Sequence, residues 1–195
     1  MVPLAALLVA ALLLVTGCTS DKGEPSTTGQ SQTSGTIAAA KSLRIEVRSS
    51  AQGPERAFNA KAAAKKATPN MERFLHRYLT VAFLDPGQQK TGWRDLLVLF
   101  DGSVKAAAKR DVDSLSLGSG AAEVKSVQPD SAKASVLFLY RGSRPAGATV
   151  KLNFEGSAEA EKGSGPVRLQ SVFQMLSTPQ GWRIAAYQSR TGEAG

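Results

Sequence analysis

The clearest helical pattern lies near the middle of the chain. Seven apolar residues recur there with the spacing of one helix side. They are Met71, Phe74, Leu75, Tyr78, Leu79, Ala82 and Phe83. Pro69-Asn70 supplies a boundary and an N-cap before them, and Asp85-Pro86-Gly87 ends the run. The pattern predicts a long amphipathic helix over residues 71–83.

Two shorter helices are expected next. The first spans residues 91–100, and the second spans residues 103–113 and stops ahead of the Gly-rich residues 117–120. The apolar side of the first consists of Trp93, Leu96, Leu97 and Phe100.

Beyond residue 120 the apolar period changes to two, which indicates strands with one buried face. The four alternating runs are Ala132 to Tyr140, Val150 to Phe154, Val167 to Met175, and Trp182 to Ala186. Residues 128–131 and 178–181 are interpreted as turns because both contain Pro at a position that turns favour. Short turns favour hairpins, so the predicted fold is α+β. N-terminal helices pack on a curved four-stranded antiparallel sheet, an arrangement that resembles the cone-like, or cystatin-like, folds.

Residues 36–68 precede this core. Leu43 to Arg48 alternates apolar and charged side chains and is interpreted as an edge strand. Ala57 to Ala67 is rich in Ala and Lys, which favours a helix but supplies little apolar stripe, so it is interpreted as a partly ordered helix or a linker. The folded domain is therefore placed at residues 69–195.

The N-terminus carries a twelve-residue apolar run, Leu4 to Val15. About 20 apolar residues are needed to cross a bilayer, whereas about 7 to 15 form the core of a signal peptide. Val15-Thr16-Gly17-Cys18 follows and resembles the lipobox of bacterial lipoproteins. One departure from that family is that Met1-Val2-Pro3 carries no basic residue.

The lipobox resemblance implies cleavage after Gly17 and attachment of a diacylglycerol to the thiol of Cys18. Residues 1–17 would then be the signal peptide, and residues 18–35 the lipidated Cys with a Ser-, Thr- and Gly-rich tether. A flexible tether of this length reaches about 20 to 25 Å. The expected location is the extracytoplasmic face of the cell membrane, with the lipid as anchor.

The predicted domain resembles the nuclear-transport-factor-two-like, or SnoaL-like, cone fold. The resemblance is carried by the helix over 71–83, the helix of Trp93 to Phe100, and the closing hairpin. The hairpin consists of Phe173-Gln174-Met175-Leu176, Gly181-Trp182-Arg183-Ile184 and Tyr187. Helices grouped ahead of all four strands of the predicted sheet are similar to the extracytoplasmic members, such as Mce-associated proteins and periplasmic domains of type IV secretion assembly factors.

Enzymes of that superfamily, such as ketosteroid isomerases and dehydratases, place an Asp or His base opposite Tyr or protonated Asp donors. The candidates here are His76, Tyr78, Asp95, Asp101, Tyr140 and Tyr187. His76 lies beside the apolar helix side, and the two aspartates occupy a helix surface and a helix end, where Asp is usually solvated or capping. No base and donor pair stands out, so no catalytic residue is assigned.

Four aromatic residues are candidates for lining a ligand pocket, although each also fits a core position. They are Tyr78, Trp93, Tyr140 and Trp182.

The chain holds one Cys and one His among its 195 residues. Most zinc, haem and iron–sulfur sites need several such ligands, so no metal and no cofactor are expected. Phosphate-binding loops, nucleophile elbows and paired acidic motifs are also absent from the sequence.

The net charge is +8, but it is spread along the chain. Residues 1–68 hold eight basic and four acidic side chains, and residues 69–195 hold sixteen and twelve. Without a dense basic cluster that includes aromatic residues, no nucleic-acid partner is expected. Basic residues near the tether are interpreted either as attracted to anionic lipid headgroups or as serving solubility.

These patterns favour a membrane-anchored, non-catalytic binding module for a protein partner or a small apolar ligand. The alternatives are a cone-fold isomerase- or dehydratase-like enzyme and an assembly subunit of a secretion or lipid-transport complex. A deep apolar pocket with a perturbed acid would favour the enzyme, and a filled cone would favour the partner.

Overall fold

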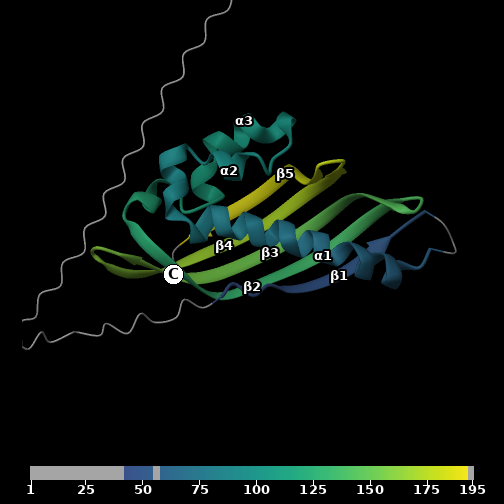
Figure 1. Cartoon of the computed structure of the whole chain (residues 1–195), viewed down its shortest axis with the longest axis horizontal. Coiled ribbons are helices and arrows are strands. Elements are labelled where there is room, and N and C mark those ends of the chain that lie inside the picture. Colours follow the sequence, from purple (N-terminus) through teal and green to yellow (C-terminus); the bar gives the residue numbers. More distant parts are fainter. Residues whose placement is uncertain (1–41, 55–57, 193–195) are drawn as a thin grey trace, which may run out of the picture. The chain divides into compact units, whose positions relative to one another are not determined.

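The computed structural model describes residues 42–54 and 58–192, in which helices cover one face of a single sheet (Figure 1). The strands are β1 (Glu46–Gln52), β2 (Val124–Arg141), β3 (Arg144–Ala160), β4 (Gly163–Thr178) and β5 (Gly181–Gly192). The helices are α1 (Ala60–Leu79), α2 (Arg94–Leu97) and α3 (Gly102–Arg110). Short π- or 3-10-helical turns lie at Thr80–Leu84, Pro86–Thr91, Val112–Ser114 and Gly118–Ala122.

The sheet has five strands in the order β1-β2-β3-β4-β5. β1 runs parallel to β2, whereas the other neighbours are antiparallel. The predicted four-stranded antiparallel sheet is therefore wrong, because β1 joins it as a fifth strand and in parallel. The reason lies in the connections, because parallel neighbours need a long crossover and the helical segment between β1 and β2 supplies it. Alternation in residues 43–48 indicates a strand but does not indicate which strand it joins.

α1 begins earlier than its apolar pattern predicts. Asn59 caps it, since the side-chain oxygen accepts a first-turn N–H at 3.0 Å. The helix continues through Pro69, so the predicted start at Pro69-Asn70 is wrong. Proline removes a helical hydrogen bond, but the Ala-rich first half favours helix, and Ala64 and Ala67 are buried. Small side chains let the helix approach the sheet, and they give only a weak apolar stripe in the sequence.

The second half of α1 and the π-helical turn after it match the prediction. All seven residues of the predicted apolar side, from Met71 to Phe83, are buried. The chain leaves this helical segment at Asp85, as expected.

The predicted helix over residues 91–100 is interrupted. Gly92 and Trp93 both adopt a left-handed conformation, with φ of 64° and 59°, so α2 retains only Arg94–Leu97. The third predicted helix is present as α3. Asp101 caps it by accepting a hydrogen bond from the N–H of Ser103 at 3.0 Å.

Only one of the two predicted turns is present. Residues 128–131 lie inside β2, where the register with β3 shifts between Pro129 and Ser131, so this predicted turn is wrong. Proline is tolerated there because a bulge releases the ladder hydrogen bond. The predicted turn at residues 178–181 is confirmed, because β4 ends at Thr178 and β5 begins at Gly181, whose φ is 109°.

Residues 99–101, called the strap, cover part of the outer edge of β5. The N–H of Asp101 donates to the Ile184 carbonyl at 2.8 Å, and the N–H of Ile184 donates to the Leu99 carbonyl at 2.9 Å. The strap therefore acts as a short extra strand on β5.

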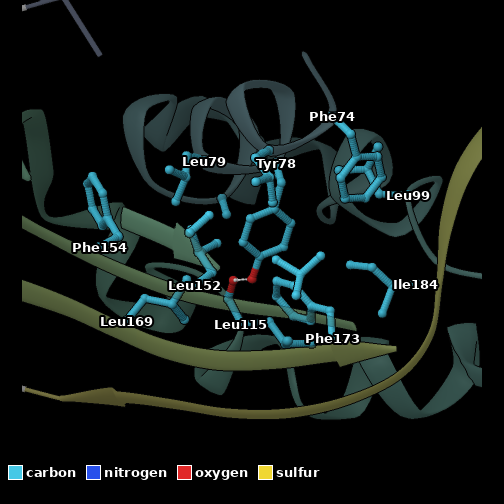
Figure 2. Close-up of a cluster of buried hydrophobic side chains, with 14 of the residues drawn as sticks. Phe74, Tyr78, Leu79, Leu99, Leu115, Leu152, Phe154, Leu169, Phe173 and Ile184 are labelled. Carbon is cyan, nitrogen blue, oxygen red and sulfur yellow. Dashed lines mark hydrogen bonds between the residues drawn. The ribbon is translucent and has the colours of Figure 1, made fainter. Parts of the chain in front are cut away.

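The core lies between α1 and the concave face of the sheet (Figure 2). Its largest fully buried side chains include Tyr78, Phe83, Phe138, Phe154 and Phe173. The Phe83 and Phe154 rings lie 5.2 Å apart, so the helical segment packs directly on β3.

Candidate functional site

Tyr78 lies at the centre of the core and does not line a pocket. It points from α1 towards the sheet and is fully buried (Figure 2). Its hydroxyl donates a hydrogen bond to the Leu115 carbonyl at 2.7 Å, and its ring meets Phe173 edge-on at 5.1 Å. Burial raises the pKa of Tyr78 well above its ordinary value. The interior of the fold is thus filled by packed side chains at this point.

The other two tyrosine hydroxyls also have partners within the fold. Tyr140 donates to the Ala63 carbonyl of α1 at 2.9 Å, and burial raises its pKa. Tyr187 donates to the Asp111 carboxylate at 2.8 Å. Burial, followed by this hydrogen bond, raises the pKa of Tyr187 to about 12. All three hydroxyls therefore have structural roles.

The structure does not bring the candidate acids and the imidazole together in the interior. His76 is exposed on α1, where its Nδ1 lies 3.4 Å from the Thr80 hydroxyl. Asp95 is exposed on α2. Asp101 caps α3, and its pKa is lowered, first by the Ser103 hydroxyl and then by the Ser103 N–H. These positions favour solvation and capping.

A groove of ≈ 600 Å³ lies between α1 and the β4–β5 hairpin. We call it the arginine groove. Its lining includes Asn70, Arg73, Phe74, Arg77, Trp182 and Arg183.

Helical spacing explains why α1 contributes several of these side chains. Asn70, Arg73 and Arg77 are separated by three and four residues, so they lie along one helix side. Phe74 and Trp182 are 8% and 7% exposed and form an apolar floor beside them. The Trp182 ring packs on Phe138 with centroids 5.8 Å apart, which fixes that part of the floor.

The charge in the arginine groove has one sign. Arg73, Arg77 and Arg183 line it, and no acidic residue does. Within the part of the chain that the structure describes, none of the three forms an ion pair. Arg73 donates to the Asn70 side-chain oxygen, and Arg183 donates to the Trp182 carbonyl at 3.1 Å.

The two helical arginines have opposing effects on helix stability, because Arg77 lies in the last turn of α1, where a cation is favourable by about 0.3–1 kcal/mol. Like charges four residues apart on a helix destabilise it by about 0.2–0.5 kcal/mol, and Arg73 and Arg77 have this spacing. Guanidinium groups present donors in a fork that matches carboxylate and phosphate. The groove therefore has the chemistry to bind an anionic group next to an apolar one.

The opposite face of the sheet carries exposed large apolar side chains. Leu137 and Leu139 of β2 and Leu176 of β4 are 38%, 41% and 44% exposed. Gly147 lies between Leu139 and Leu176 in the register. Exposed leucines alone do not identify a partner, so the arginine groove is the better candidate site.

Of the four predicted pocket residues, Trp182 lines the arginine groove, and Tyr78, Trp93 and Tyr140 do not. Trp93 is buried at the start of α2. The sequence reasoning did not identify the arginines. The available signal was the four-residue spacing of Arg73 and Arg77 on either side of Phe74, within a predicted helix.

Gly17 and Cys18 lie outside the described residues, as does the tether. No helix in the described ranges is long and apolar enough to cross a bilayer. The described residues also contain no group of three or more His, Cys, Asp or Glu that could hold a metal ion.

Comparisons with protein-family models, with curated proteins and with solved structures find no match to this chain. The resemblances to bacterial lipoproteins and to the cone fold rest on sequence patterns, and they stay predictions.

Proposed function

We propose that this chain is a membrane-anchored extracytoplasmic lipoprotein whose domain is a non-catalytic binding module for an acidic segment of a protein partner. The lipobox supports the anchor. One observation carries the binding role: Arg73, Arg77 and Arg183 surround an apolar floor and form no ion pair in the described structure.

The groove favours a protein segment over a small apolar ligand. An apolar ligand would seek an enclosed apolar cavity, but Tyr78 and its neighbours fill the centre of the interior. A peptide with acidic side chains next to one apolar side chain would satisfy both parts of the groove. Its carboxylates would bind the guanidinium groups, and its apolar side chain would cover Phe74 and Trp182.

Binding of labelled peptides to the full chain tests this proposal. The probes are decapeptides with four Glu residues around one Phe, and matched peptides with Gln in place of Glu. Fluorescence anisotropy should show binding of the acidic peptides that weakens as salt is added. Equal binding of the Gln peptides would contradict the proposal.

α1 offers a matched control for the charge change. Arg73→Glu combined with Arg77→Glu should weaken acidic-peptide binding at least about tenfold, or about 1.4 kcal/mol. Lys61→Glu combined with Lys65→Glu makes the same change at the same spacing on the same helix and should leave the affinity within about threefold. Equal losses in both variants would mean that net charge alone attracts the peptide, and the groove would lose its role.

The anchor is tested separately. Cys18→Ser should leave the chain uncleaved or soluble, because lipidation at that thiol would be lost. If this variant fractionates with membranes as the parent does, and is still cut after Gly17, the lipoprotein assignment fails while the groove is unaffected.

The enzyme alternative has its own test. His76→Gln and Asp95→Asn, made separately, should fold normally and bind the acidic peptides as the parent does. Loss of the biological role from either substitution, in a stable and correctly anchored protein, would favour catalysis instead.

A further inference from the structure

β1 forms one edge of the sheet, and no described segment pairs with its outer side. The residues leading into it continue its alternation, since Leu43, Ile45 and Val47 are half-buried and the side chains between them are exposed. β1 contains no proline and pairs with β2 without a bulge. Proline and bulges are two common ways to block an edge, and β1 as the structure describes it uses neither.

A groove of ≈ 630 Å³ lies beside this edge, between β1 and α1. We call it the β1 groove. Small side chains form much of its lining, including Ser49 and Ala51 of β1 and Ala60 and Ala64 of α1. A strand that joins β1 therefore has room for larger apolar side chains on the side that faces α1.

The chain itself carries side chains of that kind just before β1. In an antiparallel pair of two copies centred on Val47, Ile45 of one copy lies opposite Ser49 of the other. In the same register, Leu43 lies opposite Ala51. Directly opposed residues of an antiparallel pair point to the same face. Each copy would therefore place its two large apolar residues beside the small residues of its partner.

The charges agree with the same register. Glu46 of each copy lies opposite Arg48 of the other, on the exposed face of the sheet. Neither residue forms an ion pair within the described ranges. Opposite charges directly across a strand pair stabilise it, and like charges destabilise it. Both faces of the strand are thus complementary to a second copy of itself.

We propose that two copies of this chain associate through β1, antiparallel and centred on Val47, so that one continuous sheet runs through both. The contact is isologous, as in most homodimers, and the two-fold axis passes between the two Val47 residues. The proposal does not rest on the arginine groove, because none of the paired residues lines it.

Disulfide trapping tests the register. The full chain carries Cys18→Ser, so the introduced cysteine is its only thiol. With Val47→Cys, the two Cβ atoms of the pair lie about 4.5–5.5 Å apart, and mild oxidation should give a covalent dimer. With Ser49→Cys, the two cysteines lie about 13 Å apart along the strands, and the dimer should form at least tenfold more slowly. Equal rates, a faster Ser49→Cys variant, or no dimer from either would overturn the proposal.

Reversing the charges at Glu46 and Arg48 tests association of the two copies without a covalent bond. Sedimentation equilibrium of the full chain with Cys18→Ser should show association that Glu46→Arg weakens at least about tenfold. Adding Arg48→Glu to the same chain should restore it, because opposite charges again face each other. Arg190→Glu is the control, because Arg190 is exposed on β5 at the other edge of the sheet, and it should leave association unchanged.

Thermal melts of each variant show whether folding is retained. A parent chain that stays monomeric would overturn the proposal, and would leave the β1 edge for an extended segment of a different protein. Association that is insensitive to Glu46→Arg in a folded chain would also overturn it.

Discussion

The two edges of the sheet differ in what covers them. At β5 the strap makes two backbone hydrogen bonds with Ile184, and Thr191 reaches the Asp113 carbonyl with its hydroxyl at 2.7 Å. At β1 no described segment covers the outer side. Within the described ranges, the domain therefore covers part of the β5 edge with its own backbone and leaves the outer side of β1 uncovered.

The covered edge should be critical for stability. Trp182→Ala removes a buried side chain at the start of β5 and should lower the free energy of unfolding by about 3–5 kcal/mol. Arg183→Ala, at the next position, should change it by about 0.5 kcal/mol or less. Urea denaturation measures both. Equal losses would show that β5 is not held by the packing of its inner face.

Amide exchange should separate the two edges directly. The N–H groups of Ile184 and Asp101 are bonded across the covered edge and should exchange at least about tenfold more slowly than the β1 amides that face away from β2. Hydrogen exchange followed by NMR on dilute protein provides the measurement. Protection of the β1 amides that rises with protein concentration would support pairing of two copies through β1. Equal protection of the amides at the two edges in dilute protein would contradict the proposed difference between them.

Tyr187 links β5 to the segment that follows α3, through Asp111. Tyr187→Phe should cost about 0.5–1.5 kcal/mol of unfolding free energy. The raised pKa gives the pH dependence. The hydroxyl's contribution to the free energy of unfolding is fully present below pH 10.0, which is its ordinary pKa. It is lost as the pH rises through the folded-state pKa of about 12. Denaturation of both proteins at pH 7 and pH 11.5 checks this, and a difference that grows with pH would contradict it.

The smallest effect is expected at Asp101, the last residue of the strap. The pKa of Asp101 is lowered in the folded state. Its contribution to stability is therefore present above pH 3.8, its ordinary pKa, and is lost as the pH falls through the folded-state pKa. Asp101→Ala should lower the melting temperature at pH 6, and the difference should shrink towards pH 2. Asp101→Asn keeps a cap and serves as the control. A difference that stays constant over this pH range would argue against capping by the carboxylate.

The candidate site was only partly predictable. Burial of Trp182 follows from its place in an alternating strand, and the position of Arg73 and Arg77 follows from helical spacing. Their approach to Arg183 does not, because it depends on how the β4–β5 hairpin packs against α1. Tyr78 illustrates the opposite error. An aromatic hydroxyl on an apolar helix side suggested a pocket, but its hydrogen bond to Leu115 is a contact between distant segments that no local pattern reveals.

The sequence by itself determined the apolar side of the helix over residues 71–83, most of the buried face of β2, β3 and β4, and the hairpin at residues 178–181. Each of these depends on neighbours within a few residues, so periodicity and turn chemistry report them. Only the tertiary structure decided that β1 joins β2 in parallel, that the strap covers β5, and that α1 continues through Pro69. Those features depend on contacts between distant segments. Local sequence does not encode such contacts, because many partners present the same alternating face to an open strand.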